Sequence, residues 1–600
     1  MANYEVSNKT VNTMLSWIDS GEIAIPEIQR PFVWKASKVR DLIDSLYRDF
    51  PIGYLIIWQN PNVRLKGGDI SVGKKVIIDG QQRLTALSAA LRGNEIFDEN
   101  YNRKRIIISF NPVENKFDVA NPAIKKSSTW IYDISKLFKN DFSSFDFVQE
   151  YHQKNPNSNP SEISRVINKI TGIRNNLIGI IELSHQMEVE DVTDIFIRIN
   201  STGVELSQAD FAMSKISSNK DYGGNDTRKL IDYFCHLMNN PADYDNIRKN
   251  DEEFSRSELF KRISWVKSYN EDIYILNYSD VLRVAFTYKF KRGRLSELVN
   301  LLSGRDFEAR QYEEEIAEDT FKILREGVLE VINENKYKRY MMILKSVGII
   351  DKTFVRSQNV INFGYILYLT LRETGMNQAD IEKIVGRWIV MSMLTGRYSS
   401  SPESAFDYDI KRIKDKNAME VLKNIEDGEL SDAFWNVMLV TNLEASIRTN
   451  PQYNVYLMSK VKNGTKGFLS KNITIRNMIE NRGDTHHIFP KKYLQKNGFN
   501  NRGLYNQLAN YVYTQTEINI AIKDKSPKNY FSAVIEQCHK ENELKYGGIN
   551  DIEELYKNLR ENDIPVEVVD LEADRYEEFL GKRRRLMAMS IKRYYKSLGK

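Results

Sequence analysis

The sequence has 600 residues, with 86 Lys and Arg against 81 Asp and Glu, and a hydrophobic share of 41%. This length predicts several domains, and a charged share of 28% with many aromatic residues is typical of packed globular domains, not of a disordered chain. The net charge of +5 excludes a histone-like polycation but leaves room for a local basic groove. The two Cys exclude a disulfide framework and a four-Cys zinc site. The start lacks the apolar core of a signal peptide, and no apolar run reaches the roughly 18–20 residues of a membrane span, so we expect a cytoplasmic protein without a membrane partner.

The first of three predicted regions, residues 1–220, mixes strand and helix signals. Apolar residues at helical spacing follow Ser37, which we interpret as a helix N-cap. Residues 54–58 and 76–78 are rich in β-branched and aromatic side chains and predict strands. Ser207 and Asp210 have the form of a capping box that starts a helix.

A short strand, a glycine and a helix follow one another at residues 75–93. The strand ends at Asp79, Gly80 follows directly, and Leu84, Leu87 and Leu91 then recur at helical spacing. The free N–H groups and positive dipole end of such a helix can bind a phosphate, to which Arg83 can add a charge-assisted contact. Asp79 could hold a metal or orient a water. An ordinary strand-to-helix connection has the same appearance, so the segment alone leaves both interpretations open.

The second region, residues 221–440, is mainly helical and follows a candidate boundary at Gly223 and Gly224. Residues 310–333 and 377–394 are its clearest helices. We find no catalytic grouping there and interpret it as a helical scaffold, with Gly396–Ser404 as an internal linker.

The third region, residues 441–600, contains the adjacent pair His486 and His487. Neighbouring residues on a strand point to opposite faces. This arrangement suits phosphodiester hydrolysis, since one imidazole can accept the proton of the attacking water while the other binds a cation beside the leaving group. A pair of surface His in a loop is the alternative. Downstream, Asn510 precedes a helix on which Asn519 and Lys523 share one face.

Basic residues are frequent in this third region. Lys491, Lys492 and Lys523 lie close in sequence to the His pair and to Asn519. The segment from 581 to the end carries eight basic residues and no acid, and its basic residues include Arg583, Arg584 and Arg585. Such a helix can neutralise DNA phosphates without reading the base sequence, and Tyr594 and Tyr595 interleave with it. A solvated basic tail and a membrane-surface helix are the alternatives.

Three separated blocks resemble the N-terminal domain of GmrSD-type restriction endonucleases, which are modification-dependent (type IV) enzymes. The blocks are Ile25–Trp34, the segment Ile78–Thr85, and Phe196–Asp210. The resemblance covers about residues 5–215 and implies a ParB/sulfiredoxin-like α/β domain that binds and hydrolyses a nucleoside triphosphate, whether GTP, ATP or CTP. The nucleotide-site residues that it implies are Gln29, Arg30, Asp79, Gly80, Gln81, Gln82, Arg83, Arg198 and Asn200.

The strand with the His pair, the Asn in the return loop and the helix with Asn519 resemble the ββα-metal motif of HNH nucleases. By position, His487 matches the general base, and His486 and Asn519 match the metal ligands for Mg²⁺, Mn²⁺ or another divalent cation. Asn510 matches the central Asn that orients the loop of the base. The gap between His487 and Asn510 is wider than in short HNH motifs, which weakens the role of Asn510 more than that of the His pair. GmrSD-type proteins end in such a domain.

The sequence thus predicts a multidomain α+β protein, predominantly helical, with regions 1–220 (ParB/sulfiredoxin-like), 221–440 (helical) and 441–600 (HNH). We interpret it as a nucleotide-regulated, metal-dependent endonuclease that restricts foreign, modified phage DNA. The rival hypotheses are a ParB-like, nucleotide-switched DNA-binding protein whose HNH module does not cut, and an HNH-type ribonuclease. The modification sensed, the preferred nucleotide and any homo-oligomeric state stay open.

Overall fold

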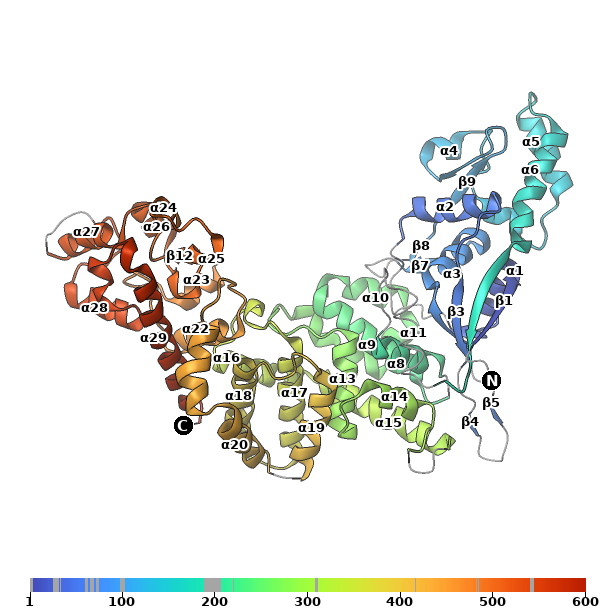
Figure 1. Cartoon of the computed structure of the whole chain (residues 1–600). Coiled ribbons are helices and arrows are strands. Elements are labelled where there is room, and N and C mark those ends of the chain that lie inside the picture. The colour runs from blue at the N-terminus through green and yellow to red at the C-terminus, as the bar shows by residue number, and fades with distance from the viewer. Residues whose placement is uncertain are drawn as a thin grey trace. The chain divides into compact units, whose positions relative to one another are not determined.

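The computed structural model describes residues 4–24, 32, 34–59, 63–64, 70–71, 75–97, 103–187, 207–219, 221–307, 311–415, 417–481, 483, 485–539 and 544–599. The chain divides into two compact units, each with elements in the order shown by colour in Figure 1. Unit 1 comprises Met1–Tyr269, Leu276–Leu282 and Leu295–Ile332, and unit 2 comprises Asn270–Ile275, Arg283–Arg294 and Asn333–Lys600. The three regions predicted from the sequence stay a prediction, because the helical middle contributes to both units. No helix among the described residues is long and apolar enough to cross a membrane.

Unit 1 contains a five-stranded mixed sheet in the order β1-β11-β3-β6-β2. Its strands are β1 (Tyr4–Thr10), β2 (Ile23–Ala24), β3 (Leu55–Gln59), β6 (Lys75–Asp79) and β11 (Leu177–Leu183). The pairs β11–β3 and β2–β6 are parallel, whereas β1–β11 and β3–β6 are antiparallel. The predicted strands at 54–58 and 76–78 are therefore confirmed as β3 and β6.

Both faces of this sheet are covered by helices. Ile57 belongs to a core cluster with Val11 of α1 (Val11–Asp19), Ile43 of α2 (Ala36–Tyr47) and Leu84 of α3 (Gln81–Leu87). The next residue, Trp58, points to the other face because side chains alternate along a strand. Its ring packs edge-on against Phe211 of α8 (Gln208–Ser218), with 6.0 Å between ring centroids.

The starts of α2 and α8 test two helix-cap predictions. The predicted N-cap at Ser37 is wrong, since α2 begins at Ala36 and the N-cap is Lys35, which makes no side-chain capping bond. The predicted capping box of α8 is confirmed, with Ser207 and Asp210 each bonded to the other's backbone N–H. The start of a helix is thus well predicted where a side chain satisfies the free N–H groups.

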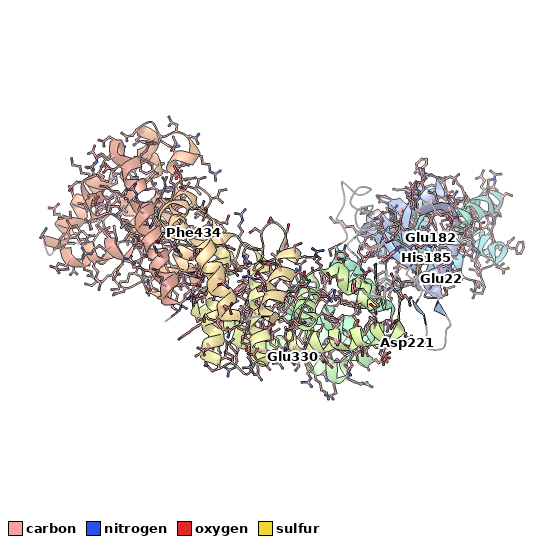
Figure 2. All side chains as sticks on the ribbon, turned by 60° about the horizontal axis from the view of Figure 1, so that its bottom comes forward. Glu22, Glu182, His185, Asp221, Glu330 and Phe434 are labelled. Carbon is pink, nitrogen blue, oxygen red and sulfur yellow. The ribbon has the colours of Figure 1, made fainter. Side chains whose placement is uncertain are left out.

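Charged groups meet at the end of the sheet where β6 begins. The Lys75 ammonium pairs with Glu182 of β11 at 2.9 Å, and the Lys75 N–H donates to the carbonyl of Glu22 at 3.0 Å. Glu182 and Glu22 are labelled in Figure 2. The Lys75 ammonium also lies 4.6 Å from the centroid of the Trp17 ring. These contacts fix the start of β6, whose other end carries Asp79.

The remaining elements of unit 1 are short strands and helices. They are β4 (Val63–Arg64), β5 (Ile70–Ser71), β7 (Ile96–Phe97), β8 (Arg103–Lys104), β9 (Ile108–Asn111), β10 (Lys116–Val119), α4 (Pro122–Lys126), α5 (Ser144–Lys154), α6 (Pro160–Gly172), α9 (Gly224–Asn239), α10 (Tyr244–Asn250), α11 (Glu252–Ser255), α12 (Glu258–Lys261), α14 (Leu295–Leu302) and α15 (Glu314–Val331), while α13 (Tyr278–Phe290) is shared between the units.

Unit 2 is a helical assembly with one two-stranded ribbon. Its helices are α16 (Glu334–Ser346), α17 (Gln358–Glu373), α18 (Gln378–Thr395), α19 (Pro402–Asp415), α20 (Ala418–Glu429), α21 (Leu439–Asn442), α22 (Pro451–Lys462), α23 (Ile475–Glu480), α24 (Lys491–Lys496), α25 (Arg502–Tyr505), α26 (Thr516–Ile522), α27 (Pro527–His539), α28 (Ile552–Glu561) and α29 (Tyr576–Ser597). The ribbon pairs β12 (Thr485–His487) with β13 (Tyr511–Tyr513).

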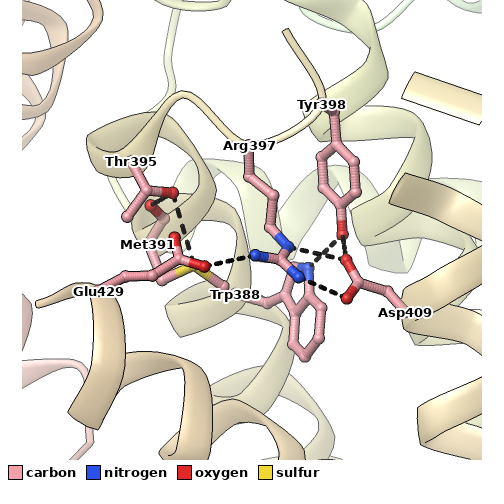
Figure 3. Close-up of polar contacts among 7 residues, drawn as sticks. All are labelled: Trp388, Met391, Thr395, Arg397, Tyr398, Asp409 and Glu429. Carbon is pink, nitrogen blue, oxygen red and sulfur yellow. Dashed lines mark hydrogen bonds and ion pairs between the residues drawn. The ribbon is translucent and has the colours of Figure 1, made fainter. Parts of the chain in front are cut away.

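The segment Gly396–Ser404 is not a free linker, contrary to the sequence interpretation. Tyr398 is buried, accepts a hydrogen bond from Trp388 Nε1 at 3.0 Å and donates to Asp409 at 2.7 Å (Figure 3). The Arg397 guanidinium binds both oxygens of Asp409, at 2.8 and 2.6 Å, and a Glu429 oxygen at 2.7 Å. This polar network ties the end of α18 to α19 and α20. The Gly and Ser residues of segment 396–404 led to the linker interpretation. The buried Tyr398 and the paired Arg397 instead fix this turn.

Candidate functional site

The His pair lies on a β-ribbon that is followed by a helix. His486 and His487 belong to β12, whose antiparallel partner β13 sets His486 opposite Val512 and His487 opposite Tyr511. Two residues after β13, α26 begins and carries Asn519. The predicted order of strand, strand and helix is therefore present, with the two imidazoles on opposite faces of one strand.

His486 faces the interior, where its Nε2 atom is buried and has no hydrogen-bond partner among the residues that the structure describes. The side chain is 6% exposed. The pKa of His486 is lowered to about 4, chiefly by burial and then by the neighbouring His487, while the side chain of Asn519 opposes the shift. A buried imidazole nitrogen without a partner costs free energy unless something binds it. The neutral His486 and the adjacent Asn519 are thus suited to hold a cation.

This pair alone does not make a full set of protein ligands. No three His, Cys, Asp or Glu side chains gather as a metal site within the described part of the chain. A divalent cation at His486 and Asn519 would therefore complete its coordination with water and substrate oxygens, as hard cations commonly do. The donor set fits such an ion.

His487 is half-buried, and its ring is oriented by Asn506. The His487 Nε2 atom lies 2.9 Å from Asn506 Oδ1, and the ring centroid lies 4.8 Å from that of Tyr511. Burial lowers the pKa of His487, the Asn506 hydrogen bond opposes this shift, and the cations Lys491 and Arg448 lower it further. The imidazole is therefore neutral near pH 7. Because the Asn506 oxygen accepts from Nε2–H, Nδ1 is the nitrogen that can take a proton.

His487 opens into a cleft of about 620 Å³. The cleft is lined by Ser446, Ile447, Arg448, Thr449, Thr485, His487, Arg502, Gly503, Asn506 and Tyr511. The Arg448 guanidinium donates to Thr485 Oγ1 and lies 5.9 Å from the centroid of the Tyr511 ring. Among the described residues that line this cleft are two Arg and no acidic side chain, so it favours an anionic ligand beside the candidate base.

Sequence reasoning missed Asn506 and Arg448. Asn506 is one of several Asn between residues 500 and 510, and only Asn510 matches the motif by position. Arg448 lies 39 positions before His487, in a loop without a recognisable pattern, and it reaches the cleft only through the fold of unit 2. Arg502, which also lines the cleft, was not assigned a role from the sequence.

Asn510 links the loop after β12 to the strand β13 from inside the protein. It is fully buried, accepts a hydrogen bond from the Phe489 N–H at 2.8 Å, and donates to the carbonyls of Phe489 at 3.0 Å and Tyr505 at 3.2 Å. Asn510 does not line the cleft. Asn510 thus holds the backbone after β12 against the start of β13.

The predicted DNA-contact residues divide into exposed and buried ones. Lys491, Lys492 and Lys523 are exposed, and so is Arg585. The prediction that Arg583 contacts DNA is wrong, because its side chain is 1% exposed and donates to the carbonyls of Ala509 and Tyr511, each at 2.8 Å.

The remainder of α29 also departs from a solvated basic helix. Arg584 is largely covered, donates to Gln507 at 2.9 Å and pairs with Glu444 at 3.5 Å. Tyr594 and Tyr595 are buried, and their hydroxyls donate to the Val347 carbonyl and to Glu426. They are not available to stack on bases. Figure 1 shows α29 beside α22, against which it packs.

The strand–glycine–helix turn of unit 1 has the predicted order β6, Gly80 and α3. Gly80 has φ 96°, and a Cβ there would lie 2.1 Å from Leu55 Cδ2, so only glycine fits. Arg83 donates to Asp79 Oδ2 at 2.6 Å and to the Ile52 carbonyl at 2.9 Å. Packing and backbone conformation thus explain why this position requires glycine. Arg83 and Asp79 form one polar pair at the turn.

The other predicted nucleotide-site residues fall into two groups. Gln81 and Gln82 lie half-buried in the first turn of α3, where the Gln81 amide donates to the Ile77 carbonyl at 3.3 Å. Gln29, Arg30, Arg198 and Asn200 lie outside the described residues.

The first part of this chain is similar to a known protein family. Residues 11–217 match the family model of the N-terminal domain of GmrSD restriction endonucleases. An uncharacterized protein of Methanocaldococcus jannaschii is 23% identical over 625 residues, which cover 92% of each chain. The match supports a relation between this first part of the chain and GmrSD restriction endonucleases. The part of the chain beyond residue 217, including the His pair, lies outside that match.

Proposed function

We propose that this chain is a metal-dependent DNA endonuclease in which β12, β13 and α26 form a cutting centre of HNH type. The observation that carries this proposal is that two neighbouring His of β12 have different surroundings. His486 presents a buried, unpartnered nitrogen next to Asn519, and His487 opens into a cleft lined by Arg448 and Arg502. His486 can thus bind a cation on one face of the strand, and His487 can accept a proton on the other face.

Each side chain at this site has its own role in the proposed hydrolysis. The phosphodiester enters the cleft, where Arg448 and Arg502 bind its non-bridging oxygens. His487 accepts the proton of the attacking water at Nδ1, while Asn506 holds the ring through Nε2. Asn510 fixes the loop behind the base through its bonds to Phe489.

A divalent cation is the cofactor that this site accommodates best. Mg²⁺ or Mn²⁺, held by His486 and Asn519, would supply positive charge for the oxygens of the phosphate and the leaving group. The neutral state of His486 at pH 7 favours such binding, since a protonated imidazole cannot be a ligand.

The metal-ligand assignment predicts a rescue by excess cation. We expect His486→Ala and Asn519→Ala to raise the Mn²⁺ concentration needed for half-maximal plasmid cleavage, by about 10–100-fold for an altered coordination shell. Titration of Mn²⁺ with each variant measures this shift. His487→Ala should show no rescue at any Mn²⁺ concentration. An identical metal response of all three variants would contradict the division between ligands and base.

Arg448 is expected to act on substrate binding and on salt sensitivity. Arg448→Ala removes a charge-assisted contact to phosphate, which is worth about 1.5–3 kcal/mol, or about 10–150-fold in kcat/KM. The slope of log affinity against log salt should fall by about one. Arg476→Ala is the matched control, because Arg476 is on α23 and pairs with Glu480 at 3.6 Å outside the cleft. Equal DNA affinity of the Arg448 variant and the parent would exclude the phosphate contact.

We further propose that the turn at Gly80 binds a nucleoside triphosphate, with GTP, ATP or CTP as candidates. Asp79, Gly80, Gln81, Gln82 and Arg83 would contribute from β6 and α3, and Gln29, Arg30, Arg198 and Asn200 from the two other blocks. The nucleotide would regulate cutting, with modified phage DNA as the substrate that the whole chain restricts. The Arg83–Asp79 pair supports this role, because a phosphate can take over the guanidinium and release the carboxylate.

The nucleotide proposal predicts a loss of hydrolysis in unit 1 variants. Asp79→Ala and Arg83→Ala should each abolish triphosphate hydrolysis, measured as phosphate release from GTP, ATP and CTP. Lys104→Ala, an exposed change in the same unit, is the control. If the nucleotide shifts a two-state equilibrium, both variants should also change plasmid cleavage, typically by about 5–150-fold. Unchanged hydrolysis in both variants would reduce the turn to a structural connection.

A further inference from the structure

A second cavity lies in unit 2 and shares no lining residue with the cleft at His487. Its volume is about 550 Å³. It is lined by Val355, Arg356, Ser357, Gln358, Asn359, Val360, Ser392, Met393, Gly396, Ser399 and Pro451. These residues come from the start of α17, the end of α18 and the start of α22. No acidic side chain is among them.

The start of α17 presents donors to this cavity. Ser357 is its N-cap, yet the Ser357 side chain makes no capping bond, although Ser is among the best capping residues. The helix has 16 residues, so its first N–H groups carry the positive end of a full helix dipole. Uncapped N–H groups at a helix start bind phosphates well.

Ser392 is an independent observation at the same cavity. The side chain is 0% exposed, and its Oγ atom has no hydrogen-bond partner within the described part of the protein. A Ser within a helix normally bonds back to the carbonyl four residues earlier, so a buried hydroxyl without any partner is costly. A ligand oxygen in the cavity would satisfy it.

Arg356 provides the charge. It is exposed at the cavity, directly before the N-cap of α17, and it makes no ion pair with any residue that the structure describes. The lining also includes the apolar side chains of Val355, Val360, Met393 and Pro451. The cavity thus offers donors for an anion and apolar contacts for an organic group.

We propose that this cavity binds a small phosphate-bearing molecule. Its phosphate lies at the start of α17, where it accepts from the free N–H groups, Ser392 Oγ and Arg356. A cavity of about 550 Å³ is in the range of small-molecule sites of ≈ 300–1,000 Å³ and can hold the organic part of a nucleotide-sized ligand.

The position of the cavity links it to the cleft at His487, a consequence that rests on the proposed nuclease function. Pro451 starts α22, and Arg448 of the cleft lies three residues earlier in the same loop. The Gln452 amide donates to the Leu394 carbonyl at 3.0 Å, which ties the start of α22 to the end of α18. A ligand held between these helix ends therefore acts on the segment that carries Arg448.

The ordered turn at residues 396–399 closes the cavity on the α18 side. Gly396 and Ser399 line it, and the Arg397–Asp409 ion pair with the buried Tyr398 holds them in place (Figure 3). A preorganised rim lowers the entropic cost of binding.

Direct binding tests the proposal. Calorimetry would measure the Kd of the full chain for inorganic phosphate and for ATP, in the Asp79→Ala background to remove the contribution of the turn at Gly80. We expect Ser392→Ala and Arg356→Gln each to weaken binding of both probes by about 10-fold or more. Lys352→Gln is the matched control, since it removes a charge from the same connection, where Lys352 pairs with Asp272 at 3.1 Å outside the cavity, and it should bind like the parent.

Ser392→Ala also separates a ligand-binding role from a structural one. Removing an unpartnered buried hydroxyl should leave the melting temperature without phosphate unchanged or higher. The increase in melting temperature on adding phosphate should be smaller than in the parent. Unaltered Kd values in both Ser392→Ala and Arg356→Gln, or no binding of either probe by the parent at millimolar concentration, would overturn the proposal.

Two further measurements complete the test. A short DNA duplex should not displace phosphate from the cavity, and displacement would overturn the assignment to a small molecule. Plasmid cleavage by the parent should change with added phosphate in a way that Arg356→Gln removes. The binding measurements do not depend on cutting. They therefore test the cavity even if the chain proves not to be a nuclease.

Discussion

His487→Ala should reduce the rate of DNA cleavage by about 10²–10⁴-fold, because general-base catalysis contributes that much to the chemical step. DNA affinity should stay close to that of the parent, since the phosphate-binding side chains Arg448 and Arg502 remain in the cleft. Cleavage of supercoiled plasmid under single-turnover conditions measures the rate, and a filter-binding assay with excess EDTA measures the affinity.

His539→Ala is the control for this variant. His539 is an exposed imidazole on α27 that does not line the cleft, so its replacement should leave the rate unchanged. If His487→Ala cut plasmid as fast as the parent, the base would be another group and the assignment of this cleft would be wrong.

Arg583→Met should destabilise unit 2 and abolish cutting without touching the cleft. The buried guanidinium donates to the carbonyls on both sides of Asn510, at Ala509 and Tyr511, and to the Asn562 carbonyl at 3.3 Å. Without it the Ala509 and Tyr511 carbonyls lose this donor, at about 1–3 kcal/mol each, whereas the Asn562 carbonyl still accepts from the Tyr456 hydroxyl. We expect the free energy of unfolding to fall by about 3–5 kcal/mol, measured by urea denaturation.

The neighbouring Arg585→Met serves as the control for this prediction. Arg585 lies on the same helix and is exposed, so its replacement should change the free energy of unfolding by no more than about 0.5 kcal/mol. Equal stability of the two variants would mean that the carbonyls of Ala509 and Tyr511 do not need the Arg583 guanidinium.

Local signals predicted those parts of the fold that depend on neighbours in sequence. The strand, glycine and helix at Asp79–Arg83, the capping box at Ser207 and the strand carrying His486 and His487 all have a pattern within about ten residues. Each rests on backbone conformation or on strand alternation, which a short segment determines by itself.

Tertiary packing decided the features that sequence reasoning missed. The count of basic residues in α29 outweighed a stripe of apolar side chains at helical spacing, so Arg583, Tyr594 and Tyr595 were taken for surface residues although the helix lies in the core. Asn506 and Arg448 join the cleft from distant loops, and no local pattern marks them. A helix with basic residues can be buried when each guanidinium finds carbonyl or carboxylate partners.

The most direct test of the central claim is cleavage of plasmid DNA by the full-length chain with Mg²⁺ or Mn²⁺. Supercoiled DNA, unmodified and modified, would be incubated with and without GTP, ATP or CTP, and with RNA as a parallel substrate. We expect nicked and linear DNA in the presence of a divalent cation, no products with EDTA, and none with His487→Ala. DNA that stays intact under every condition, while the chain still binds it, would contradict a cutting centre at β12, β13 and α26.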